Sequence, residues 1–112
     1  MSDPTIDLVR RFAALLDSGR LADLDDLLTP DCRDANPTSF QGPGRAGVAF
    51  KVAWYLAANP GARTRFLDLA RAEDGVVAEW ITEFRDGSVS RHRGHFTILG
   101  ERIAAFETTH VG

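Results

Sequence analysis

The chain contains one cysteine, no long apolar run and no excess of basic residues, and each shortage excludes a class of protein. A lone Cys32 cannot form an internal disulfide or a zinc site of several cysteines, and it is typical of a reducing compartment. No stretch approaches the roughly 18 uncharged apolar residues that a membrane-spanning helix needs. The N-terminal segment also lacks the basic-then-apolar order of a signal peptide. We therefore expect a cytoplasmic protein that does not enter a membrane.

Charge and size narrow the classes further. Thirteen basic and sixteen acidic residues give a formal net charge of -3, so the chain as a whole is not attracted to nucleic acid. Its 112 residues correspond to one domain, which we expect over residues 1–112. An apolar fraction of 44% is ordinary for a globular chain and can form a core without metals or disulfides.

The first half of the chain has the three-and-four residue spacing of amphipathic helices. Asp3 and Pro4 favour a helix start, and Ser18 followed by Gly19 favours its end. A short second helix ends before Thr29. A short strand over Cys32–Asn36 and a third helix over Arg45–Ala58 are separated by glycine and proline.

The second half of the chain is predicted to form strands. Four strands are expected over Arg63–Ala70, Val76–Arg85, Val89–Leu99 and Arg102–His110. Short turns at residues 73–75, 86–87 and 100–101 join them as hairpins. Helices segregated from an antiparallel meander define an α+β protein, in which three helices cover one face of a curved antiparallel sheet.

This order of elements resembles the NTF2-like superfamily, the cone-shaped fold of ketosteroid isomerases and SnoaL-like polyketide cyclases. Five segments carry the resemblance, which spans nearly the whole chain: Arg11–Gly19, Leu27–Asp31, Asn36–Pro37, Gly42–Gly47 and Phe96–Ile103. The resemblance implies a cone that binds a small molecule and a sheet face that is commonly used for homodimerisation. None of these segments is a catalytic signature, because the fold hosts isomerases, cyclases, epoxide hydrolases and non-enzymes.

The departures from known enzymes of this fold restrict the chemistry. Ketosteroid isomerases have a tyrosine donor and two aspartic acids at positions that fall here on Phe12, Asn36 and Gly94. Phe12 has no hydroxyl to donate, Asn36 cannot act as a base, and Gly94 has no side chain. A standard ketosteroid isomerase is therefore excluded. The arginine and two aspartates of limonene epoxide hydrolases are also incomplete, since no aspartate follows Asp86.

The hairpin turns predict which strand residues share a face. Two-residue turns would pair Ile81 with His92 and Gly94 with Glu107. One face would then carry Ile81, His92 and Phe96 together with the carboxylates Glu79 and Glu107. A single bulge or a three-residue turn would reverse any of these assignments.

We take His92, Glu79 and Glu107 as the candidate catalytic residues on this basis. If their face lines the cone, the two carboxylates would raise the basicity of His92 and position it as a general base or acid. The alternative places Glu79 on a solvated or dimer-facing side. The apolar residues Val76 and Trp80 favour that alternative, because they are of the kind that usually faces a core.

A second set of residues is predicted to contact a ligand. Asn36 either orients a ligand carbonyl or caps the turn before a proline. Trp54 continues an apolar helical stripe and belongs to either the core or the ligand site, whereas the Tyr55 hydroxyl would lie over the cavity mouth. The candidate ligand-binding residues are Asn36, Phe12, Trp54, Tyr55, Ile81 and Phe96.

No metal and no cofactor are predicted. The three histidines at positions 92, 95 and 110 invite a metal site, but His92 and His95 fall on opposite faces of a strand. The segment Gly42–Gly44 lacks the spacing of a dinucleotide-binding loop.

Three functions from different classes stay open. The first is a cofactor-independent isomerase, cyclase or hydrolase that uses His92 with Glu79 or Glu107. The second is a non-catalytic module for a small ligand of apolar or mixed polarity. The third is an interaction protein that uses Trp80, Phe84 and Phe106 on the outer sheet face. A homodimer is expected in each case.

Overall fold

Three α-helices and five strands follow the predicted order in the computed structural model, which describes residues 3–111. Helix α1 spans Pro4–Ser18, α2 spans Leu24–Leu27 after one 3-10 turn, and α3 spans Gly44–Ala58. Met1, Ser2 and Gly112, which the single-domain expectation includes, lie outside the described residues. No helix within residues 3–111 is both long and apolar enough to span a membrane.

The strands form one mixed sheet with the order β1-β5-β4-β3-β2. Their bounds are Leu28–Asp34 for β1, Arg63–Ala72 for β2, Gly75–Glu83 for β3, Val89–Leu99 for β4 and Arg102–His110 for β5. Strands β2 to β5 form the predicted antiparallel meander. The expectation of a wholly antiparallel sheet is corrected by β1, which pairs parallel to β5. A parallel pair needs a long crossover, and here α3 and the meander separate the two strands.

Local chemistry explains the ends of α1. The side chain of Asp3 accepts a hydrogen bond from the Thr5 N–H at 3.0 Å, and Pro4 occupies the first turn. At the other end, Gly19 adopts φ 77° and donates its N–H to the Leu15 carbonyl oxygen. A residue that ends a helix in the left-handed conformation is least strained when it is glycine, because glycine has no Cβ to clash with the backbone.

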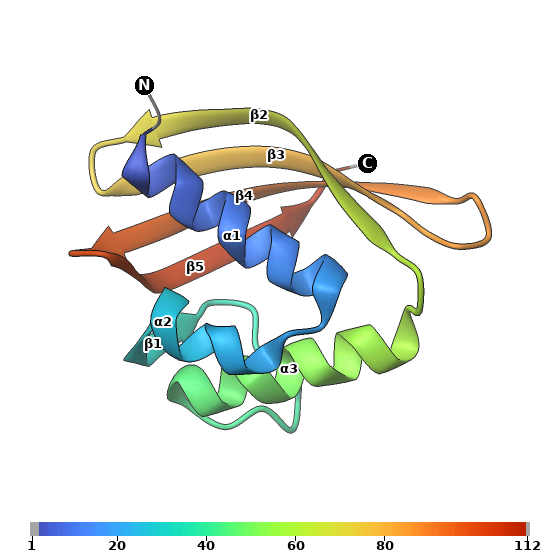
Figure 1. Ribbon diagram of the computed structural model, residues 1–112, viewed down its shortest axis with the longest axis horizontal. Coiled ribbons are helices and arrows are strands. Elements are labelled where there is room, and N and C mark those ends of the chain that lie inside the picture. The colour runs from blue at the N-terminus through green and yellow to red at the C-terminus, as the bar shows by residue number, and fades with distance from the viewer. Residues whose placement is uncertain (1–2, 112) are drawn as a thin grey trace.

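The helices lie on the concave side of the curved sheet (Figure 1). The core forms between these layers. Its largest side chains with less than 2% exposure are Val9, Leu24, Leu27, Leu28, Cys32, Val48, Val76 and Ile103. Cys32 is therefore a small buried apolar residue.

The register of β3 against β4 differs from the prediction by one residue. The Phe84 N–H donates to the Ser88 carbonyl oxygen at 2.8 Å, so the turn has three residues instead of two. A shift of one residue moves every side chain of a strand to the other face relative to its partner. Trp80 consequently lies opposite His92, and the predicted pairing of Ile81 with His92 is wrong.

The register of β4 against β5 changes at a bulge. The two-residue turn at Gly100 is present as predicted, with Leu99 opposite Arg102. Between Thr97 and Ile98 the register then shifts, so Gly94 lies opposite Thr108. The predicted pairing of Gly94 with Glu107 is wrong because it assumed an unbroken register.

These two differences decide which residues face the helices. The concave face carries Trp80, Thr82, His92, Phe96, Phe106 and Thr108. The outer face carries Glu79, Ile81, Arg91, Arg93, His95 and Glu107.

Candidate functional site

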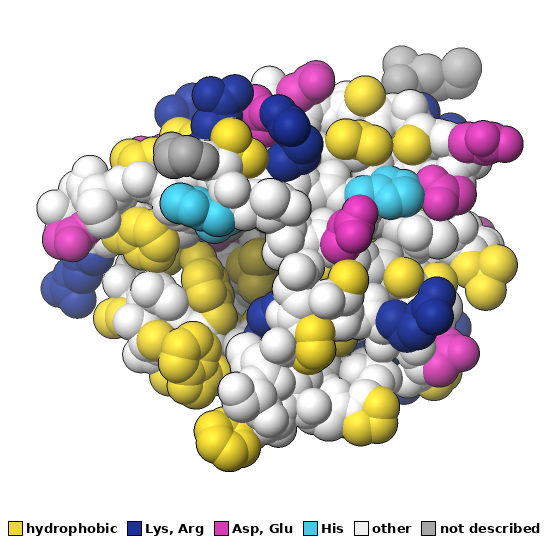
Figure 2. Space-filling model, turned by 180° about the vertical axis from the view of Figure 1, so that it is seen from behind, with side chains coloured by type: hydrophobic (Ala, Val, Ile, Leu, Met, Phe, Trp, Pro, Cys, Tyr) yellow, Lys and Arg dark blue, Asp and Glu magenta, His cyan; other side chains and the backbone are white. Residues whose placement is uncertain are grey.

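A cavity of about 320 Å³ lies between α1, α3 and the concave face of the sheet. Figure 2 shows a hollow in the molecular surface with hydrophobic side chains inside it. Sixteen residues line the cavity, and ten of them are apolar: Val9, Phe12, Ala13, Leu16, Val48, Val52, Phe66, Trp80, Phe96 and Phe106. An apolar cleft of this size with a few polar groups is typical of a small-molecule site.

Aromatic rings form one wall of the cavity. The ring centroid of Phe12 lies 5.7 Å from that of Phe106 and 6.3 Å from that of Phe96. Trp80 continues the cluster, with centroid distances of 6.1 Å to Phe96 and 6.4 Å to Phe66. Rings at these distances and tilts attract one another and hold the wall in shape.

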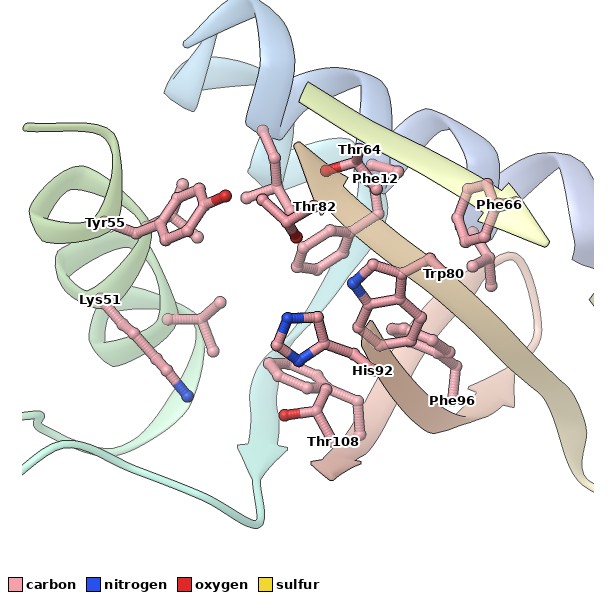
Figure 3. Close-up of a pocket in the computed structure, with 16 residues that line it drawn as sticks. Phe12, Lys51, Tyr55, Thr64, Phe66, Trp80, Thr82, His92, Phe96 and Thr108 are labelled. Atoms are coloured by element: carbon pink, nitrogen blue, oxygen red, sulfur yellow. The ribbon is translucent and has the colours of Figure 1, made fainter. Parts of the chain in front are cut away.

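The imidazole of His92 projects into this apolar space from β4 (Figure 3). It stacks on Trp80 with a centroid distance of 5.7 Å and an interplanar angle of 23°. Its Nε2 lies 2.7 Å from the Ser90 hydroxyl, and the His110 ring centroid is 5.4 Å away. Burial lowers the pKa of His92, and the charge on His110 lowers it further. The ring is therefore neutral at pH 7 and has a lone pair to accept a proton.

Two residues of α3 contribute polar groups to the same cavity (Figure 3). Burial raises the pKa of the Tyr55 phenol, although a hydrogen bond with Thr82 opposes this change. Tyr55 is therefore protonated at neutral pH and is a hydrogen-bond donor. Lys51 lies one helical turn earlier on α3 and also lines the cavity, at the lower left of Figure 3.

A partly buried ion pair holds the Lys51 ammonium in place. Its Nζ donates to Asp34 Oδ2 and to the Asn36 carbonyl oxygen, both at 2.8 Å. The Asp34 side chain is 3% exposed and also accepts from Gln41 Nε2 at 3.2 Å. An ammonium group has three N–H donors, so one remains for a ligand.

The predicted cluster of His92 with two carboxylates is not formed. Glu79 lies on the outer face, where it pairs with Arg91 and, at 3.1 Å, with Arg93. These two hydrogen bonds lower the pKa of the Glu79 carboxyl. Glu107 also lies on the outer face, opposite His95. The prediction that Glu79 and Glu107 flank His92 is wrong because both hairpin registers differ from those assumed.

The predicted ligand-binding residues divide into two groups. Phe12, Tyr55 and Phe96 line the cavity, and their role in binding stays a prediction. Asn36, Trp54 and Ile81 do not line it.

Each of the three has a different position. The side-chain oxygen of Asn36 accepts from the Thr108 N–H at 2.9 Å and so ties its loop to β5. Trp54 is 62% exposed on the outward side of α3, which excludes both the core and the cavity. Ile81 is half-buried on the outer sheet face. Trp80 and Phe106, which the third hypothesis placed on that outer face, line the cavity instead.

Several cavity residues were missed, and some had a usable signal. Trp80 and Thr82 share a period of two with the buried Val76 and Ala78, so burial preference alone favours them for the concave face. Lys51 precedes Tyr55 by one helical turn and therefore shares its side of α3.

The described residues 3–111 contain no group of three or more His, Cys, Asp or Glu side chains that could hold a metal ion. His92 and His95 lie on opposite faces of the sheet, as predicted.

The fold occurs in several solved structures. An NTF2-like protein of unknown function from Mesorhizobium loti has a TM-score of 0.77 at 22% identity, covering 100% of this chain and 97% of that one. A candidate isomerase of the SnoaL-like family from Agrobacterium tumefaciens has a TM-score of 0.82 at 16% identity, and the match covers 97% of this chain and 98% of that one. IdmH, a candidate polyketide cyclase from Streptomyces antibioticus, has a TM-score of 0.79 at 19% identity, and the match covers 97% of this chain and 92% of that one. The structure is thus an α+β protein of the NTF2-like fold.

Sequence comparison assigns the family. The SnoaL-like domain matches residues 9–107, and the chain belongs to this family. A search of curated proteins finds no significant match.

Proposed function

We propose that the cavity binds a small, mostly apolar molecule with an oxygen substituent, and that His92 acts on it as a general base. The chain would then be a cofactor-independent isomerase or cyclase. The observation that carries this proposal is the position of the His92 imidazole, which projects into a mostly apolar cavity where burial lowers its pKa. Proteins of the same fold named as candidate cyclases and isomerases agree with it.

The cavity wall favours a flat ligand. Trp80, Phe96 and Phe106 provide ring faces, and an aromatic or conjugated molecule would stack against them. The polar groups of the lining, Lys51, Tyr55 and His92 among them, would orient its oxygen atoms.

The proposed step is removal of a proton from carbon. When Nε2–H of His92 donates to the Ser90 hydroxyl, Nδ1 keeps a free lone pair. Nδ1 takes a proton from a C–H beside a carbonyl group, and the electron pair of that bond moves onto the carbonyl oxygen. The imidazolium returns the proton to another carbon in an isomerisation. In a cyclisation, the carbanion attacks the carbon of a second carbonyl group. The oxygen of that second carbonyl then receives the proton from the imidazolium.

The negative oxygen formed in this step needs hydrogen-bond donors. Tyr55 offers a protonated phenol, and Lys51 offers its remaining N–H. Donors in an apolar cavity stabilise such an oxygen more than water does, because they are already oriented.

Deuterium exchange tests the proposal without the natural substrate. The protein is incubated in D2O with 1-phenylbutane-1,3-dione, which is flat, mostly apolar and enolisable, and loss of its central C–H signal is followed by NMR. We expect His92→Gln to slow the protein-catalysed exchange by about 100-fold or more, as removal of a general base does. Tyr55→Phe should slow it less. His95→Gln on the outer face is the matched control and should exchange at the wild-type rate.

A second candidate is a ligand-binding protein without catalysis. It is favoured by the absence of carboxylates among the described residues that line the cavity, because His92 then has no acidic partner. Quenching of Trp80 fluorescence by the diketone with no exchange above the buffer rate would support this candidate. Equal exchange in wild type and His92→Gln would contradict the role of His92.

A further inference from the structure

The polar groups that α3 contributes to the cavity lie at two different ends of it. Of the described residues that line the cavity, Lys51 is the one that is a lysine, arginine, aspartate or glutamate. Lys51 and Thr108 lie in the lower part of Figure 3, whereas Tyr55 and Thr82 lie in the upper part. Lys51 and Tyr55 are separated by four residues of α3, which is a rise of about 6 Å. The His92 imidazole faces both ends from the sheet (Figure 3).

The ion pair of Lys51 with Asp34 presents its positive partner to the cavity. The Lys51 side chain is 28% exposed and lines the cavity, whereas the Asp34 side chain is 3% exposed and does not line it. Asp34 also accepts hydrogen bonds from two neutral donors, the Asn36 N–H at 2.9 Å and Gln41 Nε2 at 3.2 Å. These donors stabilise the carboxylate in addition to the ammonium group. The Lys51 ammonium therefore keeps an N–H and part of its charge for a ligand.

An acidic side chain lies just outside the other end of the cavity. Asp17 Oδ1 accepts a hydrogen bond at 3.0 Å from the N–H of Thr64, which lines the cavity. Burial is the main cause that raises the pKa of Tyr55, and the negative charge of Asp17 raises it further. A negative group on a ligand is therefore disfavoured near Tyr55 and favoured near Lys51.

We propose that the ligand is an anion, a flat and mostly apolar molecule whose carboxylate binds Lys51 and whose neutral carbonyl oxygen accepts a hydrogen bond from Tyr55. This assignment rests on the proposed function and narrows its substrate class to a keto acid. Of the two donors available to the oxygen that becomes negative, Tyr55 then holds that oxygen and Lys51 holds the carboxylate. The carboxylate does not react. Lys51 selects and orients the ligand, so that a C–H between its two polar ends faces His92.

Two ligands of nearly equal shape test the charge preference. The compounds 2-naphthoate and 2-naphthamide differ only in a carboxylate against a neutral carboxamide, and NMR titration of the protein amide signals measures both dissociation constants. We expect 2-naphthoate to bind about fivefold more tightly, which is the size of effect that a partly exposed ion pair has. Equal binding, tighter binding of 2-naphthamide, or no binding of 2-naphthoate at millimolar concentration would overturn the proposal.

Variants test whether Lys51 is the source of the preference. Lys51→Met combined with Asp34→Asn removes both charges of the ion pair, and this double variant should bind the two ligands equally well. Asp34→Asn alone leaves the ammonium group unpaired and should increase the preference for 2-naphthoate. Arg45→Met is the matched control and should keep the wild-type preference, since Arg45 lies on the same helix, pairs with Asp25 and does not line the cavity. A preference that survives in the double variant, or decreases in Asp34→Asn, would contradict the role of Lys51.

The orientation of the ligand has its own readout. Intermolecular NOEs should connect the ring protons beside the carboxylate of 2-naphthoate with the Thr108 methyl group, and the protons of the far ring with the Tyr55 ring. The reverse pattern would overturn the proposed orientation. Both ligands lack a C–H that His92 could remove, so these results are independent of the deuterium exchange. A lost charge preference with normal exchange would remove the keto acid and leave the proposed base in place.

Discussion

Gly94 is required because the Trp80 ring lies against its backbone. A Cβ at position 94 would be 2.7 Å from two atoms of the Trp80 ring and 3.2 Å from an atom of the Phe96 ring. The indole cannot move freely, since it packs edge-on against Phe66 and stacks on His92. Gly94→Ala should therefore displace the ring and destabilise the protein by about 1–3 kcal/mol, the usual cost of overpacking.

Urea denaturation measures this cost. A double-mutant cycle with Trp80→Phe identifies its source, because the smaller ring lacks the two atoms that the new methyl group would meet. We expect Gly94→Ala to cost much less in the Trp80→Phe background. Gly42→Ala is the matched control, since no heavy atom lies within 4 Å of its Cβ, and its effect should stay within about 0.5 kcal/mol. A Gly94→Ala protein as stable as wild type would refute the proposed contact.

Three further predictions concern polar groups that are wholly or partly buried. Because the fold lowers the pKa of His92, the unfolded chain binds a proton more readily below the ordinary value of 6.5, so stability falls as the pH drops through this region. His92→Gln should flatten that part of a pH series of urea unfolding curves, and an unchanged slope would contradict it. Burial raises the pKa of the Cys32 thiol to about 11, so iodoacetamide should label the unfolded protein but not the native one. Lys51→Met leaves the Asp34 carboxylate without its cation and should cost about 1–3 kcal/mol in thermal or urea unfolding, with partial recovery on adding Asp34→Asn.

Most element boundaries could be predicted, because they depend on residues close in sequence. Asp3 caps α1 and Gly19 ends it, both through bonds to residues within four positions. The predicted bounds Val89–Leu99 and Arg102–His110 match β4 and β5. The parallel pairing of β1 with β5 was not predicted, because nothing near β1 in sequence specifies a partner that follows three other strands.

The candidate site was predicted less well, because strand register depends on details that the sequence pattern does not contain. One extra turn residue moved Glu79 to the outer face relative to His92. One bulge near Thr97 did the same for Glu107. The contact of Lys51 with Asp34 joins α3 to β1 across a long loop, so it too depends on the tertiary structure.

An NMR pH titration of assigned histidines tests most directly whether His92 is a neutral base within the cavity. The structure predicts that His92 titrates below its ordinary value of 6.5, because its ring is partly buried and faces His110. His110→Gln removes one of these causes, so the pKa of His92 should rise part of the way back in that variant. A His92 that titrates at its ordinary value and ignores His110→Gln would place the ring in solvent and contradict the proposed site.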